Sequence, residues 1–189
     1  MSVSLPPPRK QRRIILAVVG ICAAPIAASY LLYYVWKPAG GLTYGQLLET
    51  RPVPAFRQVT LDGKAADLGQ LKGKWLLAMV DDGSCNVACL DALHALRQIR
   101  IAQGKEMGRL ERVWFLTGTA APSAEALARA DGARLFRAQD PVPLPGDQTG
   151  GYYLIDPLGN QVVRYPRSAD PVKVIKEIGK FLKNNENLG

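Results

Sequence analysis

Two runs of apolar residues predict the central strands of a sheet. Residues 75–80 are apolar throughout, and residues 112–117 are mostly apolar. A strand with one side facing solvent would instead alternate polar and apolar side chains, so we expect both strands to be buried on both faces.

Turn residues mark two predicted hairpins. The first covers residues 56–67, where alternating apolar and polar positions lead into Asp62-Gly63. The second covers residues 152–165 and turns within 156–160, whose sequence is Asp-Pro-Leu-Gly-Asn. The segment 137–151 before it is rich in proline and glycine, so we expect an irregular loop there.

Helical periodicity predicts three helices. Residues 86–102 carry an apolar side chain every three positions, and residues 124–130 follow Ser123, a typical helix cap. The last helix begins at Asp170-Pro171 and keeps an apolar stripe of period 3.6. Because helices and strands alternate before a final hairpin and helix, the sequence predicts an α/β domain with a mixed central sheet flanked by helices.

An uncharged segment near the amino terminus predicts one transmembrane helix. Residues 14–36 contain no charged side chain, and about 20 apolar residues suffice to cross a hydrocarbon core of about 30 Å. Basic residues crowd the amino side of this anchor, so residues 1–13 are expected to form a cytoplasmic tail and the rest of the chain to be exported. The alternative is a signal peptide cleaved near residues 27–29, but the apolar run continues beyond that site.

Residues 37–53 contain several prolines and glycines and are predicted to be a linker, with a helical turn over 44–49. The folded domain is then expected over residues 54–189. We expect a single-pass protein of a bacterial inner membrane with this domain in the periplasm. In that oxidising compartment, a close pair of cysteines is a disulfide, a metal site or a redox centre.

The charge of the chain does not indicate nucleic-acid binding. The formal net charge is +8, from 24 basic and 16 acidic residues, but part of the excess flanks the anchor as Arg9, Lys10, Arg12 and Arg13. The lysines of the last helix are expected on its solvated face, and no nucleic-acid motif accompanies them.

Cys85 and Cys89 are the candidate functional residues. They follow the apolar strand and open the helix over 86–102, with Ser84 or Cys85 as its cap. The positive end of the helix dipole favours a thiolate there, and Cα atoms four residues apart on a helix are about 6 Å apart. The pair can therefore form a disulfide or hold a soft metal ion, unless both side chains are simply small and buried.

Asp81 and Asp82 precede the cysteines and are possible neighbours of the site. Their carboxylates would disfavour a thiolate and attract a cation. Cys22 lies within the predicted anchor and is expected to be a small apolar residue of the membrane helix.

The order of these segments resembles the thioredoxin fold and, more narrowly, the Sco/SenC family. The matching features, within residues 54–182, are Leu71-Lys72-Gly73-Lys74-Trp75, the Cys-x3-Cys of Cys85 and Cys89, and Tyr153-Leu154-Ile155-Asp156-Pro157-Leu158-Gly159. The cysteine spacing is the specific feature, since thioredoxin-like oxidoreductases usually have two intervening residues. The resemblance implies a membrane-anchored protein that helps to assemble the copper centre of cytochrome c oxidase.

The chain departs from the Sco/SenC pattern at its metal ligands. Asn86 stands where the family usually has proline, and Gln148, after Asp147, stands where it has a copper-binding histidine. The single histidine, His94, lies about 140° around the helix from Cys89 and cannot replace that ligand. Two thiolates still suit Cu(I), so copper remains the candidate cofactor and both Asp147 and Gln148 are possible site neighbours.

The chain also departs from disulfide enzymes of the thioredoxin type. Those enzymes place a cis proline opposite the cysteines, and the matching position here is Gly150. The nearest proline is Pro145.

The expected function is that of a Sco-like assembly factor. Cys85, the more exposed thiol, would meet the copper-bearing subunit of the oxidase, and Cys89 would close a disulfide or complete a Cu(I) site. One alternative is a general periplasmic thiol-disulfide oxidoreductase in which Cys85 attacks and Cys89 resolves; another is a non-catalytic thioredoxin-fold scaffold with a permanent disulfide. The sequence leaves open whether the protein is an enzyme.

Overall fold

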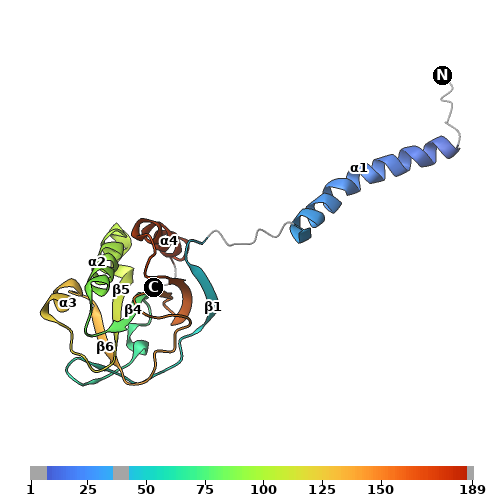
Figure 1. Cartoon of the computed structure of the whole chain (residues 1–189). Helices are drawn as coiled ribbons and strands as arrows, with labels where there is room; N and C mark the ends of the chain where they lie inside the picture. Colours follow the sequence, from blue (N-terminus) through green and yellow to red (C-terminus); the bar gives the residue numbers. More distant parts are fainter. Residues whose placement is uncertain (1–7, 36–42, 187–189) are drawn as a thin grey trace. The chain divides into compact units, whose positions relative to one another are not determined.

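The computed structural model describes residues 8–35 and 43–186, which fall into two separate units divided after Gly41. The first unit is helix α1, Pro8–Val35, within which Gln11–Leu32 is long and apolar enough to cross a membrane (Figure 1). Residues 1–7 of the predicted tail, Trp36 of the anchor, 37–42 of the linker and 187–189 of the domain lie outside the described residues.

The second unit contains one mixed sheet. Among the described residues it has eight strands in the order β1-β8-β7-β4-β5-β6-β2-β3. Strand β4 runs parallel to β5, β5 runs parallel to β6, and the other neighbouring pairs are antiparallel. The strands are β1 Gln46–Pro52, β2 Gln58–Thr60, β3 Ala65–Ala66, β4 Trp75–Asp82, β5 Leu110–Thr117, β6 Arg134–Ala138, β7 Tyr152–Ile155 and β8 Asn160–Tyr165.

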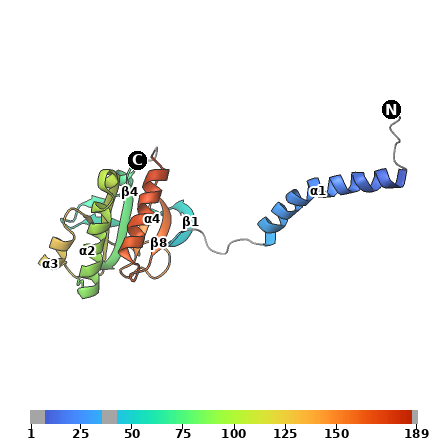
Figure 2. The ribbon, with the colours of Figure 1, turned by 90° about the horizontal axis from the view of Figure 1, so that it is seen from above.

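The α-helices of this unit pack on one face of the sheet. They are α2 Val87–Ile101, α3 Ala124–Arg129 and α4 Pro171–Asn184. Figure 2 shows α2 and α4 lying side by side across the strands. The 3-10 helix η1, Leu68–Leu71, contributes to the opposite face, and a second one, η2, Gly104–Arg109, follows α2. The predicted cap Ser123 is confirmed, because its side chain accepts a hydrogen bond from the first turn of α3. Asp170, where the last helix was predicted to begin, caps α4 in the same way.

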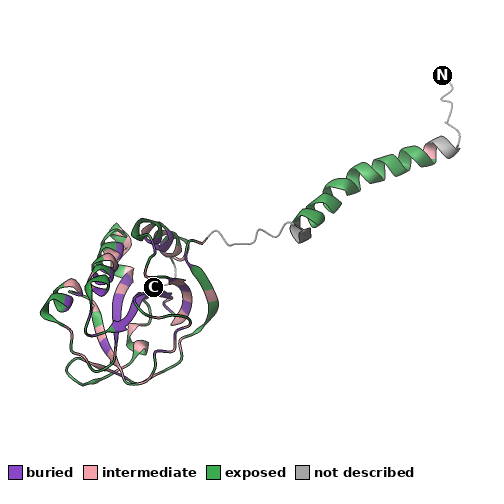
Figure 3. Cartoon of the chain, viewed as in Figure 1, coloured by how far each residue is buried: buried purple, intermediate pink, exposed green. Residues whose placement is uncertain are grey.

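Strand β4 separates two hydrophobic cores, as its unbroken apolar pattern predicted. Leu77 and Met79 face the core beneath the helices, whereas Leu76, Ala78 and Val80 face the core on the other side. All of these side chains are buried, and the central strands form the buried interior of the unit in Figure 3. Alternation along the strand therefore places neighbouring residues in different cores.

Two predictions about the sheet were wrong. The helical turn expected over residues 44–49 is instead the start of β1, which pairs with β8 inside the segment predicted to be linker. The backbone N–H groups of Tyr44 and Gly45 donate to the carboxylate of Glu177 on α4, at 2.6 and 2.9 Å. The start of this segment is thus fixed by a helix far along the chain, which local sequence could not indicate.

Strand β6 was also missed. The sequence pattern indicates no strand at residues 134–136 and predicted an irregular loop from residue 137, but Arg134–Ala138 pairs with both β5 and β2. Arginines at positions 134 and 137 flank the buried Phe136 and hide its strand pattern. Arg57 also binds Asp140 across this edge of the sheet, with Nη2 2.7 Å from Oδ1.

Candidate functional site: a disulfide at the start of helix α2

Cys85 and Cys89 form a disulfide across the first turn of α2. Their Cα atoms are 5.0 Å apart, closer than an ideal helix would place them. Cys85 lies before the helix with φ of 40°, a left-handed conformation that is uncommon for residues other than glycine. The local backbone has therefore left the helical path, so that the two sulfurs meet.

Asn86 caps α2, rather than the predicted Ser84 or Cys85. Its side-chain Oδ1 accepts a hydrogen bond from the backbone N–H of Cys89 at 3.1 Å. An asparagine cap satisfies one of the unpaired N–H groups of the first turn. The position where the Sco/SenC pattern has proline thus has a clear structural role in this chain.

The turn between β4 and the disulfide is tightly held. The Asp82 carboxylate accepts a hydrogen bond from Ser84 N at 2.7 Å, and the Asp82 carbonyl accepts one from Cys85 N at 3.3 Å. A Cβ on Gly83 would lie 2.1 Å from the carbonyl oxygen of Ala120, so only glycine fits there. The exposed Asp82 side chain is therefore used to shape this turn.

The disulfide is nearly covered by the protein. Cys85 is 7% exposed and Cys89 1%, which is the predicted order of exposure. The residues around Cys85 are open to solvent: Ser84, Asn86 and Val87 are all exposed. Cys85 is therefore bordered by an exposed rim formed by these three residues.

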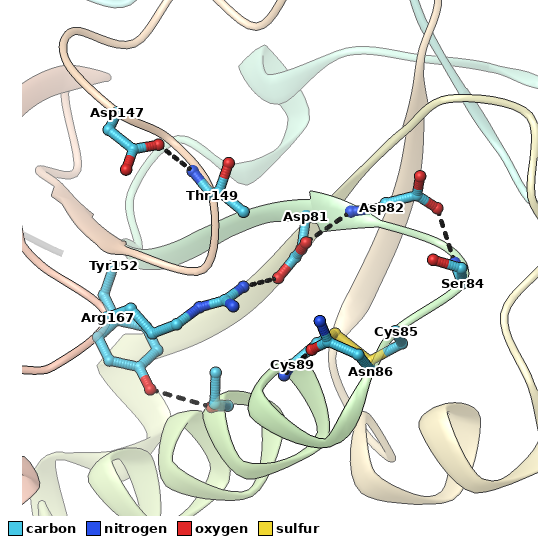
Figure 4. A network of polar contacts seen from close by, with 11 residues as sticks. Asp81, Asp82, Ser84, Cys85, Asn86, Cys89, Asp147, Thr149, Tyr152 and Arg167 are labelled. Carbon is cyan, nitrogen blue, oxygen red and sulfur yellow. Dashed lines mark hydrogen bonds and ion pairs between the residues drawn. A yellow bond between two sulfur atoms is a disulfide. The ribbon is translucent and has the colours of Figure 1, made fainter.

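Asp81 is buried beside the disulfide and is paired with Arg167. The Asp81 Oδ2 accepts a hydrogen bond from Arg167 Nη2, and its Oδ1 accepts one from Asp82 N at 2.8 Å. Figure 4 shows this ion pair above the sulfur atoms. Asp81 was expected to attract a cation, and the cation that it binds is an arginine of the chain itself.

Gly150 makes room for Arg167. A Cβ at this position would lie 1.8 Å from Arg167 Nε, and the residue has φ of +67°. Its N–H also donates to the carbonyl of Val80 at 3.0 Å. Proline has no N–H and cannot adopt this φ, so the element typical of disulfide enzymes does not fit at this position.

Asp147 and Gln148, the other predicted neighbours, are engaged within their own loop. Gln148 Nε2 donates to the carbonyls of Val142, at 2.7 Å, and of Leu144. Asp147 Oδ1 accepts from Thr149 N at 3.1 Å, and Figure 4 shows it well separated from the sulfurs. Within the described ranges, no group of three or more His, Cys, Asp or Glu residues could hold a metal ion.

Tyr152 connects β7 to the helix that carries the disulfide. Its hydroxyl donates to the carbonyl of Ala92 at 3.2 Å, and burial raises the pKa of Tyr152 to about 12. His94 lies on the same helix and is exposed, and among the described residues it joins no cluster with the two cysteines that could hold a metal ion. Tyr152 and Arg167 are the site residues that the sequence analysis missed.

A family described as "Transmembrane-like, thioredoxin-like, C-terminal domain" matches residues 75–185, more than half of the chain. The chain belongs to this family. The match covers β4, the disulfide, the strand β7 and the helix α4, so every element of the site lies within the family's domain. No curated protein sequence matches the chain.

Solved structures confirm the thioredoxin-like fold and the likeness to Sco proteins. Yeast Sco1 with copper bound is 18% identical with a TM-score of 0.58, over 70% of this chain and 88% of that protein. ScoI of Bradyrhizobium japonicum with copper bound is 19% identical with a TM-score of 0.51, over 70% and 100%. A thiol:disulfide interchange protein of Chlorobium tepidum is 16% identical with a TM-score of 0.52, over 70% and 97%. Because these sequence identities are low, the comparisons show only that this chain shares its fold with the Sco proteins and with the thiol:disulfide interchange protein.

Proposed function

We propose that the protein is a membrane-anchored, Sco-like assembly factor that keeps the copper-binding cysteines of cytochrome c oxidase reduced. The observation that carries the proposal is the Cys85–Cys89 disulfide at the amino end of α2, with Asp81 already bound to Arg167. Two sulfurs in this position suit electron exchange with another thiol pair. In this role the protein is a thiol-disulfide oxidoreductase.

The reaction begins with both cysteines reduced. The Cys85 thiolate attacks one sulfur of the partner's disulfide, and the partner's other sulfur leaves as a thiolate and takes up a proton. Cys89 loses its proton and attacks the Cys85 sulfur, which releases the second partner thiol and forms the disulfide seen here. Two electrons pass to the partner, and an exported dithiol reductant must return the pair to its starting state.

The helix start supports this division of roles. Orphan N–H groups and the helix dipole stabilise a thiolate at the first turn of α2. Cys85 adjoins the exposed rim, whereas Cys89 is enclosed, so Cys85 is the attacking residue and Cys89 the resolving one. The exposed Val87 supplies an apolar contact for the partner beside Cys85.

The anchor defines where the reaction takes place. Helix α1 contains a stretch suited to a membrane span, and the basic residues Arg9, Lys10, Arg12 and Arg13 precede its uncharged run, which begins at Ile14. By the positive-inside rule the amino end stays in the cytoplasm and the domain enters the periplasm of a bacterial inner membrane. The partner is then the exported copper-bearing subunit of the oxidase, held at the same membrane.

Cu(I) carriage is the second candidate. The specific observation in its favour is that both sulfurs already lie together, and two thiolates suit a soft ion that accepts few ligands. The donor set does not fit a Cu(II) site with an imidazole, because Gln148 replaces the histidine and its amide binds its own loop. Copper would therefore be a cargo held by Cys85 and Cys89 alone.

The full chain in detergent, prepared without oxygen, distinguishes these roles. We expect reduced protein to reduce a small disulfide reagent, Cys89→Ser to accumulate a mixed disulfide through Cys85, and Cys85→Ser to be inactive. Cys22→Ser removes the free cysteine of α1 and serves as the matched control. Cu(I) titration of the same samples tests carriage.

The result in cells completes the test. Replacing both Cys85 and Cys89 should leave the oxidase without its copper centre, and added reductant should restore it. An intact copper centre in the double variant, together with no exchange by the purified protein, would contradict the proposal.

A further inference from the structure

A second site lies beneath the carboxyl half of α2, away from the disulfide. It is a cavity of about 250 Å³ lined by Arg97, Arg100, Ile101, Arg112, Asp131 and Gly132. Three of the six residues are arginines, from α2 and β5. Neither the family match nor the disulfide explains such a concentration of guanidinium groups.

Arg112 is the central residue of this arginine cavity. It is 4% exposed, and its Nη2 donates to the carbonyl of Asp131. Its other two nitrogens, Nε and Nη1, are buried and have no hydrogen-bond partner among the described residues. A Cβ on Gly132 would lie 3.0 Å from Nη2, so the glycine leaves space for the guanidinium. Among the described residues, Arg112 is the one side chain with two buried nitrogens that lack a partner, and because a buried unpaired donor is costly, this indicates a missing acceptor.

The charge of the cavity is not balanced. The pKa of Arg112 is lowered by burial and then by the positive charges of Arg100 and Arg97, which outweigh the opposite effect of Asp131 and Glu111. The closest carboxylate contact is weak, because Asp131 Oδ2 lies 4.0 Å from Arg97 Nη2 and its side chain is 73% exposed. Arg100 donates Nε to the Leu110 carbonyl at 2.6 Å, which fixes this arginine but adds no negative charge. The missing acceptor is therefore expected to be an anion.

We propose that this arginine cavity binds a phosphate group, either as inorganic phosphate or as the head group of an anionic phospholipid. Guanidinium groups bind tetrahedral oxyanions through paired N–H donors, and three of them match a group that carries up to two negative charges. A carboxylate brings only one charge and two oxygens, so it would leave part of the site unmatched. Arg97 forms the exposed rim of the cavity, and Arg112 forms its buried floor.

The test uses the full chain in phosphatidylcholine nanodiscs and follows its melting temperature. Inorganic phosphate should raise the melting temperature of the wild type more than sodium chloride of equal ionic strength does. Arg97→Gln should weaken phosphate binding about tenfold, since a hydrogen bond to a charged group is lost. Arg129→Gln removes the same charge from α3 outside the cavity and should change binding by less than about twofold.

A second set of nanodiscs identifies the source of the phosphate group. If the head group is the ligand, phosphatidylglycerol should raise the melting temperature without added phosphate, and Arg97→Gln should remove that increase. If inorganic phosphate is the ligand, only the first arm responds. Arg112→Met should abolish the increase in melting temperature in both arms. If Arg112→Met does not fold, the result with Arg97→Gln alone decides whether the cavity binds a phosphate group. The proposal is overturned if neither phosphate nor phosphatidylglycerol raises the melting temperature in a way that Arg97→Gln removes.

Discussion

Two arginines near opposite ends of α2 meet different electrostatic surroundings. Arg167 lies beside the disulfide and binds the buried carboxylate of Asp81. Arg112 lies below Arg97 and Arg100 and binds a backbone carbonyl, while two of its nitrogens have no partner among the residues described. Nε of Arg167 is also buried without a partner among the described residues, so the two ends of α2 differ in charge: a carboxylate balances the arginine at the disulfide end, whereas the other end has an excess of positive charge.

The largest expected effect on stability comes from removing Arg167, the arginine at the disulfide end of α2. Arg167→Met leaves the Asp81 carboxylate buried without its cation, and a charge left unpaired in this way is strongly destabilising. Because Arg167 is 31% exposed, we expect a loss of about 2 kcal/mol in the free energy of unfolding, less than for a fully buried pair. Denaturant unfolding of the full chain measures it.

A second substitution checks the cause. Adding Asp81→Asn removes the stranded charge but keeps an oxygen to accept the N–H of Asp82. Most of the lost stability should return in the double variant. A double variant as unstable as Arg167→Met would show that the arginine acts through packing instead.

Tyr152→Phe tests the hydrogen bond that joins β7 to α2 near the same end. Losing the bond to the Ala92 carbonyl should cost about 1 kcal/mol. Since burial raises the pKa of Tyr152 from 10.0 to about 12, its contribution is complete below pH 10 and is lost as the pH rises through 12. Unfolding measured between these values should therefore depend less steeply on pH in the variant.

Arg112→Met removes the buried arginine at the other end of α2 and should change the free energy of unfolding by less. Methionine keeps the apolar part of the side chain and removes a buried charge that the carboxylates of Asp131 and Glu111 offset only in part. Replacement of buried charges by apolar groups is often neutral, so we expect a change within about 1 kcal/mol in phosphate-free buffer. A loss as large as that of Arg167→Met would remove the distinction between the two arginines.

The smallest effect is expected at Arg57 and Asp140, an exposed pair that serves as a reference. Arg57 lowers the pKa of Asp140 from 3.8 to about 2, so any contribution is present above pH 3.8 and is lost as the pH falls through 2. Asp140→Asn should leave unfolding unchanged at neutral pH in high salt, because solvent and salt screen exposed pairs. A clear loss in the free energy of unfolding of this variant would mean that exposed ion pairs also stabilise this domain.

The sequence predicted those features that depend on neighbouring residues. The unbroken apolar run of β4 indicated burial on both faces, and the cap Ser123 and the pair Asp170-Pro171 marked two helix starts. The position of the cysteines after a strand placed them at the start of a helix. Each of these patterns acts within a few residues, which explains why it could be recognised.

The features that were missed depend on distant partners. Arg167 meets Asp81, 86 residues earlier, and β1 pairs with β8 across a similarly long separation. Nothing in the local sequence of either segment indicates these contacts. Arg112 opens a predicted strand, where a charged residue is ordinary, and only the fold reveals that its guanidinium is buried.

A redox titration of the full chain tests the central claim most directly. The fraction of Cys85 and Cys89 in the disulfide would be measured by free-thiol labelling in glutathione buffers of known potential. We predict a reversible two-electron couple with a midpoint above about −300 mV, the range of disulfides that exchange with partners. A disulfide that stays closed well below that potential would be structural, and would contradict a role in thiol exchange or in Cu(I) carriage.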